Sequence, residues 1–536
     1  MLNVVSVILN SDLLVYEWQY KCLQELKDKE VIFLIANEDK NLSENIKKRN
    51  YLKYFFYYCI NLFAIKKKKI KIKFHQFKNC KVKNIFFYTR KNFWQELTQK
   101  SITDIISFSP DFIYKCGMDL LHINKDLEKI SIISHHHGDP SNYRGRPAGF
   151  YEILKGESVI GQMVQVISNK LDAGRILSYG ESKIYRWSYK KTLDDSYKLS
   201  PIIFQKALIN LEKNIFIDKD PIGRNYKLPS NYLSIFFIWK GILSFIYRIL
   251  YGLFYEKSWQ VAYLKNFSIK KINEPSDLFN LIDSFSNNFK TFKITKGYDF
   301  YADPFILNQN IIFEGLNSYS RKGNLLLADI ESNKIIENFN IKSKHLSYPY
   351  TNQFVNKTYI YPDSGSLKKA IFMNFENQTL LKISMMENFR SGLIDPSVIE
   401  HNGLFYLFAN YPNENCVLRL WVASNPSFND ANEHKCSPVC ITPIGGRSGG
   451  RIFKFKNKIY RFGQNYGGDY GNGLILFEIN LNENYYSEVK ISSFKFNDLY
   501  KGPHTIDFSS NLLTWDFYTE KFNFFAGIKR IIGKIL

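Results

Sequence analysis

The sequence predicts a Rossmann-like α/β domain followed by an all-β five-bladed β-propeller. Residues 3–9 form a β-branched apolar run, residues 17–26 show a helical pattern, and residues 31–36 form a second apolar run. Strand, helix and strand at this spacing predict a parallel sheet. From about residue 295 aromatic and β-branched residues alternate without helical periodicity. This change of pattern predicts a separate all-β region.

Five similar short sequence motifs, or blade phrases, divide the all-β region. They recur at intervals of about 45 to 55 residues, the length of one four-stranded propeller blade. Most are followed by a turn and a second strand, so five phrases predict five blades. The phrases are Tyr301-Ala-Asp-Pro-Phe-Ile, Ser347-Tyr-Pro-Tyr, Ile394-Asp-Pro-Ser-Val-Ile, Gly449-Gly-Arg-Ile-Phe and Gly502-Pro-His-Thr-Ile-Asp.

A chain of 536 residues is too long for one hydrophobic core, so several parts are expected. We predict an α/β domain over residues 1–200, a linker over 201–290, the propeller over 291–520 and a basic amphipathic tail over 521–536. Inside the α/β domain, residues 109–121 predict a strand, a glycine turn and the start of a helix.

A second short strand is predicted at residues 130–133. It places the segment from His135 to Asp139 just beyond a carboxyl end of the sheet. Ligands bind at this edge in open α/β sheets, so the segment is a candidate site.

Composition narrows the classes of function. Lys and Arg total 72 against 50 Asp and Glu, which gives a formal net charge of +22. This charge predicts an anionic partner such as nucleic acid, nucleotide or phospholipid headgroups, although AT-rich coding DNA also enriches lysine. Seven scattered cysteines favour a reducing compartment over a disulfide framework. Cys436 and Cys440, with His434 before them, lack a second ligand pair, so no metal site is expected.

The first ten residues predict a strand, because they contain no basic leader and no cleavage site. We therefore expect a cytoplasmic protein. Three segments also favour a peripheral position on the inner face of the cell membrane. They are residues 51–65, which are apolar and run into the polybasic stretch 66–73, a helix at 232–255, and the tail at 524–536.

The helix predicted at 232–255 carries a polar stripe on an otherwise apolar surface. Such a helix lies in the plane of a membrane interface, and its two charges argue against a spanning segment. A helix packed between domains would show a similar pattern, and an inserted helix would explain residues 51–65. The stripe consists of Lys240, Ser244, Arg248, Tyr251 and Tyr255.

Several residues that can carry chemistry follow the strand at 130–133. They are Ser134, His135, His136, His137 and Asp139, then Tyr143-Arg-Gly145 and Asp172-Ala-Gly174. Three consecutive histidines suggest a metal site. Adjacent residues on one strand point to opposite faces, however, so the three cannot easily share one ion.

This order of motifs resembles the formyltransferase family that includes methionyl-tRNA formyltransferase and the sugar N-formyltransferases. The family pattern is Asn-x-His, then Tyr-Arg-Gly, then Asp-x-Gly, with the 28-residue interval seen here between Arg144 and Asp172. The resemblance covers roughly residues 1–200 and is close over 105–180. It implies an α/β formyltransferase fold that transfers a formyl group from 10-formyltetrahydrofolate to an amine. No match to the carboxy-terminal domain of the transfer-RNA enzyme is found, which favours an amino-sugar acceptor.

The resemblance implies that His136 stabilises a tetrahedral oxyanion and that Asp172 orders the groups around it. Ser134 stands where the family has Asn, and its hydroxyl reaches less far. His135 or His137 is then expected to supply the missing donor, and a one-residue gap would make His137 the catalytic histidine. Substrate contacts are expected from His135, Asp139 (or else a helix cap), Tyr143, Arg144 and Gly145.

The five phrases resemble five-bladed propellers related to glycoside hydrolase family 43 and to the amino-terminal domain of plant glucosamine inositolphosphorylceramide transferases. Asp303 and Asp395 stand where the hydrolase fold has its base and its second aspartate. The fourth phrase has Gly449-Gly-Arg451 where a general acid is expected, and Glu314 and Asp363 are nearby options. We interpret the propeller as a glycan-binding domain, with a carbohydrate-active centre or a scaffold as alternatives. Its candidate substrate-binding residues are Asp303, Asp395, Arg451 and His504.

The leading hypothesis is therefore a formyltransferase that modifies a nucleotide- or lipid-linked amino sugar in surface polysaccharide biosynthesis. The alternative is a carbohydrate-active glycosyltransferase or glycosidase with its chemistry in the propeller and a drifted formyltransferase-like domain. A nucleic-acid binder is supported by charge alone. The pattern leaves the oligomeric state unknown.

Overall fold

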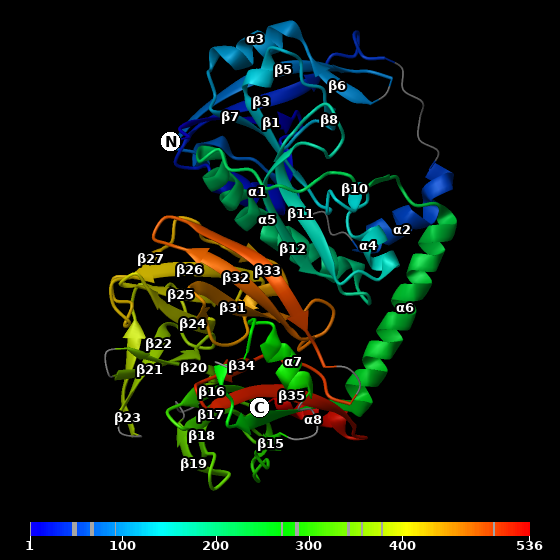
Figure 1. The fold of residues 1–536 in the computed structure, drawn as a ribbon. Coiled ribbons are helices and arrows are strands. Elements are labelled where there is room, and N and C mark those ends of the chain that lie inside the picture. Colours follow the sequence, from blue (N-terminus) through cyan, green and yellow to red (C-terminus); the bar gives the residue numbers. More distant parts are fainter. Residues whose placement is uncertain are drawn as a thin grey trace. The chain divides into compact units, whose positions relative to one another are not determined.

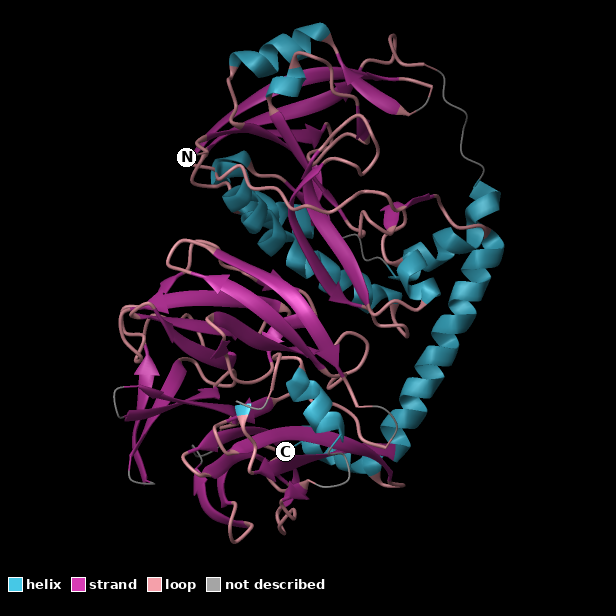
Figure 2. Ribbon diagram, viewed as in Figure 1, coloured by secondary structure: helices cyan, strands magenta, loops and turns pink. Residues whose placement is uncertain are grey.

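The chain forms two compact units, Met1–Phe245 and Ile246–Leu536 (Figure 1). Helices and strands mix in the first unit, whereas strands dominate the second (Figure 2). The computed structural model describes residues 2–44, 51–64, 69–91, 93–269, 272–284, 289–339, 344–354, 357–376, 379–496 and 499–535.

The first unit is an α/β domain built on a nine-stranded sheet. The five strands β1, β3, β5, β7 and β9 pair in parallel at its centre, as the apolar runs predict. β11 and β12 extend one side in antiparallel pairing, so the sheet is mixed. The strands, in spatial order, are β12 (Arg175–Lys183), β11 (Val159–Val166), β9 (Ser131–His136), β7 (Phe112–Lys115), β1 (Val4–Asn10), β3 (Glu30–Glu38), β5 (Asn79–Thr89), β6 (Trp94–Leu97) and β8 (Leu120–Leu121).

One predicted helix start is wrong. After Gly117 the chain forms the short strand β8, which pairs in parallel with β6. A Cβ on Gly117 would lie 2.5 Å from the backbone nitrogen of Asn10, so the turn is pressed against β1. The Gln95 side chain then accepts a hydrogen bond from the Asp119 backbone at 2.6 Å, and this contact directs the segment to the sheet edge.

The strand predicted at 130–133 extends further than expected. β9 continues to His136, so His135 and His136 belong to the strand and not to the loop beyond it. The first five α-helices of this unit are α1 (Glu17–Gln24), α2 (Phe55–Ala64), α3 (Gln99–Ser107), α4 (Phe150–Lys155) and α5 (Tyr189–Glu212).

The helix expected at 232–255 is α6 (Asn231–Phe254). By length and composition it could cross a membrane, and it is the one such helix within the part of the chain that the structure describes. Only 11% of the most apolar 18-residue segment of this helix is buried. The polybasic stretch is described from Lys69 onward, so its residues 66–68 lie outside the described residues.

The second unit is a five-bladed β-propeller, as the five phrases predict. Each blade is an antiparallel sheet of four principal strands. The first four blades are β16–β19 (Tyr298–Leu307, Asn310–Asn317, Gly323–Asp329, Lys334–Phe339), β20–β23 (Ser347–Phe354, Lys357–Asp363, Ala370–Glu376, Thr379–Met386), β24–β28 (Ile394–His401, Leu404–Asn410, Val417–Ala423, Asn432–Glu433, Cys440–Ile441) and β29–β33 (Ile444–Ser448, Phe453–Phe455, Lys458–Asn465, Leu474–Leu481, Tyr486–Phe494).

The fifth blade joins the two ends of the unit. β14 (Tyr255–Lys265) pairs along its whole length with β35 (Leu512–Phe522), flanked by β34 (Ile506–Phe508) and β15 (Lys290–Thr291). β14 lies in the segment predicted as a linker, where no blade phrase marks it. The propeller is thus closed by a strand that precedes its first phrase.

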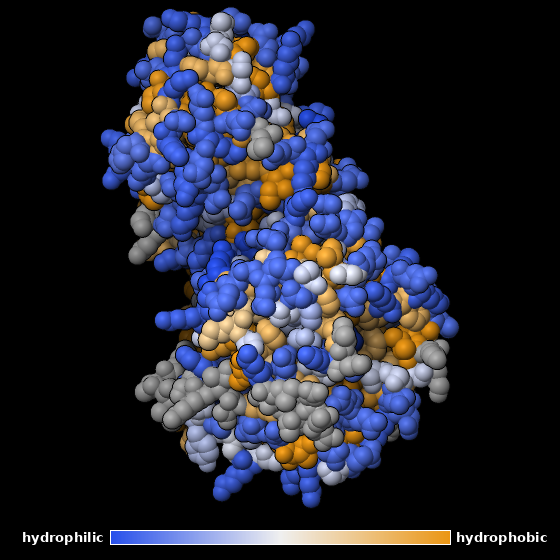
Figure 3. Space-filling view, turned by 90° about the vertical axis from the view of Figure 1, so that its left-hand side faces the viewer, coloured by the Kyte–Doolittle hydropathy of each residue, from blue (hydrophilic) through white to orange (hydrophobic). Residues whose placement is uncertain are grey.

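The surface drawn in Figure 3 is largely hydrophilic, and its hydrophobic residues form separate small areas. Scattered apolar residues of this kind are normal on a protein in water. The exposed apolar residues of α2 and α6 differ from this pattern, because several of them are adjacent along each helix.

Candidate active site

The first strands of three blades share a backbone distortion. The pairing register shifts within β16, β20 and β24. Asp303, Tyr348 and Asp395 lie at these shifts with φ of 54°, 44° and 45°. Each precedes a proline, which disfavours a right-handed helical conformation at the preceding residue. Strained non-glycine residues at a repeated bulge are a feature of functional sites.

Four buried carboxyl groups lie together in the propeller. Asp303 is on β16, Glu314 on β17, Asp363 at the end of β21 and Asp395 on β24. Arg447 of β29 is the cation closest to them: its Nε donates to Asp395, and its guanidinium lies 4.0 Å from Asp363. The cluster therefore carries more carboxyl groups than nearby cations.

Burial and mutual repulsion raise the pKa values of three carboxyl groups in this cluster. Burial raises the pKa of Glu314 well above its usual range, and the charges of Asp303, Asp363 and Asp395 raise it further. Burial also raises the pKa of Asp363 to about 7, opposed by Arg447. It raises the pKa of Asp303 to about 6, opposed by His504. Glu314 therefore holds its proton to a higher pH than an ordinary glutamate does.

Asp395 is held by two donors, the guanidinium of Arg447 and the amide of Gln464, whose Nε2 lies 2.6 Å from Asp395 Oδ2. Tyr470 lies beside the same arginine, with the guanidinium carbon 6.0 Å from its ring centroid. Tyr470 is 41% exposed, so an aromatic face lies at the rim of the buried cluster. Aromatic faces beside carboxyl groups suit a ligand with apolar and hydroxyl-bearing surfaces, such as a sugar.

His504 connects Asp303 to a second buried aspartate. Its Nδ1 lies 2.5 Å from Asp516 and its Nε2 lies 3.7 Å from Asp303. Its ring stacks on Trp259 at 4.2 Å. Burial disfavours the imidazolium form, but the carboxylates of Asp516 and Asp303 outweigh burial and raise the pKa of His504.

Asp303, His504 and Asp516 also have the geometry of a metal group, since their ligand atoms lie within 4.8 Å of one another. Asp516 is already satisfied, because it accepts backbone hydrogen bonds from His504, Thr505 and Asp303 at 2.8, 3.0 and 3.1 Å. We therefore interpret the three residues as a hydrogen-bonded network that positions Asp303.

Of the propeller residues chosen from the sequence, Asp303, Asp395 and His504 belong to this cluster. Arg451 does not, because its guanidinium pairs with the fully buried Asp507. Arg447 holds the place in the cluster instead. The sequence contains a signal for it, since Gly-Gly-Arg occurs twice in succession, ending at Arg447 and at Arg451.

In the α/β domain the structure brings His136 and Asp172 together, with 3.2 Å between Nδ1 and Oδ1. Asp172 also accepts a hydrogen bond from the Gly145 backbone at 2.9 Å. Burial disfavours the charged imidazole, but Asp172 outweighs it and raises the pKa of His136. The other ring nitrogen, Nε2, faces the Tyr143 carbonyl oxygen at 3.4 Å. Both ring nitrogens are thus engaged within the protein.

The other residues of the motif are likewise engaged. His135 and His137 contact the Ser200 carbonyl and hydroxyl oxygens at 3.2 and 3.0 Å. Burial lowers the pKa of His135 to about 4 and that of His137 well below its usual range. The remaining contacts are Ser134 Oγ with the His135 carbonyl at 3.5 Å, Asp139 with Lys219 at 2.9 Å, Tyr143 OH with Glu157 at 2.7 Å, and Arg144 Nε with the Gly223 carbonyl at 2.6 Å.

Similarity to known proteins is clearest in the propeller. Residues 288–508 match the family model of the amino-terminal domain of glucosamine inositolphosphorylceramide transferase 1, which confirms that resemblance. The transferase of that name from Oryza sativa subsp. japonica is 29% identical over 214 residues. The match spans 36% of this chain and 28% of the rice protein. The one from Arabidopsis thaliana is 27% identical over 212 residues, spanning 36% of this chain and 27% of that protein.

Solved structures similar to this chain include a sugar-modifying enzyme. WlaRD, a sugar 3N-formyl transferase, is 14% identical and covers 59% of this chain and 95% of its own, with a TM-score of 0.28. A score this low adds no argument about function.

The named relatives contradict the leading hypothesis. They are glucosamine inositolphosphorylceramide transferases, so the prediction that the chain is a formyltransferase acting from 10-formyltetrahydrofolate on an amino sugar is wrong. They favour the alternative, in which the propeller carries the carbohydrate chemistry. Three expectations from the sequence stay predictions. They are binding of the folate cofactor, a cytoplasmic location and the absence of a nucleic-acid partner.

Proposed function

We propose that this protein is a carbohydrate-active enzyme that breaks or transfers a glycosidic bond of a glycan or glycolipid at the carboxyl cluster of its propeller. The observation that carries the proposal is the cluster itself, in which Glu314 is buried beside three aspartates whose charges, with burial, raise its pKa. Glycosidic bond cleavage uses one protonated and one ionised carboxyl group on either side of the bond. The propeller offers Glu314, whose pKa is raised, and Asp395, which is paired with Arg447, for these two roles.

In the proposed reaction Glu314 donates its proton to the leaving glycosidic oxygen as the carbon–oxygen bond breaks. The positive charge that develops on the sugar is stabilised by Asp395, whose carboxylate is oriented by Arg447 and Gln464. Asp303 accepts the proton of the incoming hydroxyl group or water. Its pKa of about 6 suits a base that works near neutral pH.

The named relatives support a glycan or lipid substrate for the propeller. The α/β domain, which resembles formyltransferases in its motifs, has drifted from that chemistry in this proposal. Both nitrogens of His136 are engaged, and a Cβ added at Gly138 would lie 2.7 Å from its Nε2, which shows how closely the backbone covers that nitrogen. No donor of His136 is left for a substrate oxyanion.

The test is turnover of glucosaminide and N-acetylglucosaminide substrates, both aryl glycosides and glycolipids, by the purified chain. We expect Glu314→Gln to lower kcat at least ~100-fold, because an amide cannot supply the proton. The matched control is Asp299→Asn, which removes an exposed carboxylate on the same strand as Asp303. Undiminished turnover by Glu314→Gln would refute the proposed acid. Sugar binding without turnover in the unsubstituted protein would show a binding domain instead.

A further inference from the structure

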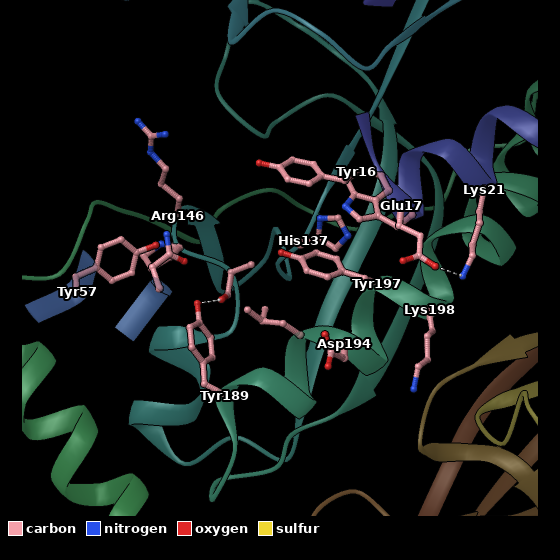
Figure 4. A pocket seen from close by; sticks show the side chains of 15 residues that line it. Tyr16, Glu17, Lys21, Tyr57, His137, Arg146, Tyr189, Asp194, Tyr197 and Lys198 are labelled. Atoms are coloured by element: carbon pink, nitrogen blue, oxygen red, sulfur yellow. Dashed lines mark hydrogen bonds and ion pairs between the residues drawn. The ribbon is translucent and has the colours of Figure 1, made fainter. Parts of the chain in front are cut away.

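The α/β domain contains a cavity of about 540 Å³ that the proposed propeller chemistry does not use. It is open to solvent on one side and is lined by residues of α1, α2 and α5, by Tyr16, by His137 and by the loop from Arg146 to Ala148. Figure 4 shows His137 and Tyr197 on one side of it and Tyr57 on the other. Aromatic rings dominate its wall, and they are Tyr16, Trp18, Tyr57, Tyr189 and Tyr197.

The wall of this cavity also carries charged and polar side chains, which are Glu17, Lys21, Asn61, His137, Arg146, Asp194 and Lys198. Lys21 pairs with Glu17 at 3.3 Å, and Lys198 pairs with Asp195 at 2.9 Å. Burial keeps the pKa of His137 well below its usual range, so its ring is neutral between Trp18 and Tyr197, each 4.9 Å away. Asn61 Oδ1 is buried and has no hydrogen-bond partner among the described residues. The Arg146 side chain is exposed and forms no hydrogen bond or ion pair with the part of the chain that the structure describes. The Asn61 amide oxygen and the Arg146 guanidinium are thus available to a ligand, and the exposed Asp194 carboxylate lies on the same wall.

α2 forms one wall of the cavity and also presents an apolar surface to the outside. Tyr57 and Asn61 face the cavity, whereas Leu62 and Phe63 are 80% and 87% exposed. A helix that exposes such side chains to water loses the favourable free energy of burying them. Its outer surface is therefore suited to an apolar environment.

The first half of α6 continues this surface. The Asn231 side chain joins the two helices, accepting from the Phe56 backbone at 3.2 Å and donating to the Leu52 carbonyl at 2.8 Å. Phe237 anchors α6 to the domain by stacking on Phe150 at 4.3 Å. Other large side chains of this half remain exposed, among them Tyr232, Ile235, Trp239 and Ile242.

The charges next to this surface are positive. Residues 51–64 and 231–245 contain no acidic residue, and each segment has one lysine, Lys53 and Lys240. Lys240 donates to the Leu154 carbonyl at 3.0 Å, which holds its ammonium group at the domain and away from the outer face. With a net charge of +22 for the chain, the surface complements an anionic bilayer.

We propose that the cavity binds the headgroup of an anionic membrane lipid, a polyol or sugar linked through phosphate, while α2 and the first half of α6 rest in the bilayer interface. Arg146 pairs with the phosphate, because a free guanidinium binds phosphate oxygens in pairs. The aromatic wall stacks on the ring of the headgroup, and a hydroxyl group donates to Asn61 Oδ1. This site is in a different unit from the carboxyl cluster, so it does not depend on the proposed propeller chemistry.

The test is sedimentation of the full chain with vesicles of phosphatidylcholine alone, or with about 20 mol% phosphatidylinositol or phosphatidylserine. We expect binding at least ~5-fold tighter to the inositol lipid than to the serine lipid, because only the former fills the cavity with a ring. Arg146→Gln should abolish this preference. Leu62→Asn with Phe63→Ser should weaken binding to both anionic vesicles at least ~10-fold, since the apolar contact is lost.

The control is Ile106→Ser on α3, which removes an exposed apolar side chain that does not line the cavity. It should leave vesicle binding unchanged, and all variants should retain the thermal unfolding of the parent protein. Equal binding to both anionic lipids, or a preference that survives Arg146→Gln, would overturn the headgroup site. Unchanged binding by the Leu62 and Phe63 double variant would overturn the membrane-facing surface.

Discussion

Glu314 shows how neighbouring residues decide the protonation of a carboxyl group. Its closest basic neighbour is His345, with 3.8 Å between Nε2 and Oε1, and burial lowers the pKa of that histidine. Arg447 donates to Asp395 instead. Among the described residues Glu314 therefore has no close cation to stabilise its ionised form, and burial raises its pKa, as the proposed role of proton donor requires.

The raised pKa values also predict how stability depends on pH. A carboxyl group with a raised folded-state pKa binds its proton more tightly when folded, so its stabilising contribution is complete below the unfolded value near 4. It is lost as pH rises through the folded value. For Asp363 this window extends to about pH 7.

We therefore expect the free energy of unfolding of the propeller to fall between about pH 4 and 7, by up to about 1.4 kcal/mol per pH unit for each such group. Asp363→Asn should make this slope shallower, and Asp299→Asn, at an exposed position, should not. Denaturant unfolding at a series of pH values measures both. Parallel pH profiles for the parent and Asp363→Asn would contradict the assigned shift.

At the scale of elements, local patterns predicted most strands but not long-range pairing. The blade phrases mark the first strands because each repeats the same bulge and turn. β14 has no such phrase, and its partner β35 lies about 250 residues later, so no local pattern reveals the pairing. The same limit explains why the sequence predicts Arg451 and misses Arg447, since only the folded blade shows which guanidinium meets Asp395.

Closure by β14 makes its buried side chains essential to the propeller. Val261 is fully buried in β14, so we expect Val261→Asp to abolish cooperative unfolding of the propeller, because the carboxylate would be buried without a partner. Gln260→Glu, at the adjacent half-buried position, is the matched control and should keep it. Differential scanning calorimetry measures the transition. A propeller transition that survives Val261→Asp unaltered would show that β14 is dispensable.

At the scale of the whole molecule, the chain combines two units that each contain a candidate site. The motifs in the first unit correctly predicted that His136 and Asp172 lie together, because the spacing of a motif reflects the geometry of a fold. They did not predict whether that geometry still serves the same reaction. In this chain the contacts of His136 within the protein and the relatives of the propeller both favour chemistry in the second unit.

The most direct test of this assignment is to compare Asp303→Asn with Asp172→Asn for formation of product from a glycan or glycolipid substrate. Asp303→Asn removes the proposed base of the propeller, and Asp172→Asn removes the partner of His136 in the α/β domain. We expect product to be lost with Asp303→Asn and retained with Asp172→Asn. Retention with Asp303→Asn and loss with Asp172→Asn would place the chemistry in the α/β domain and contradict the account.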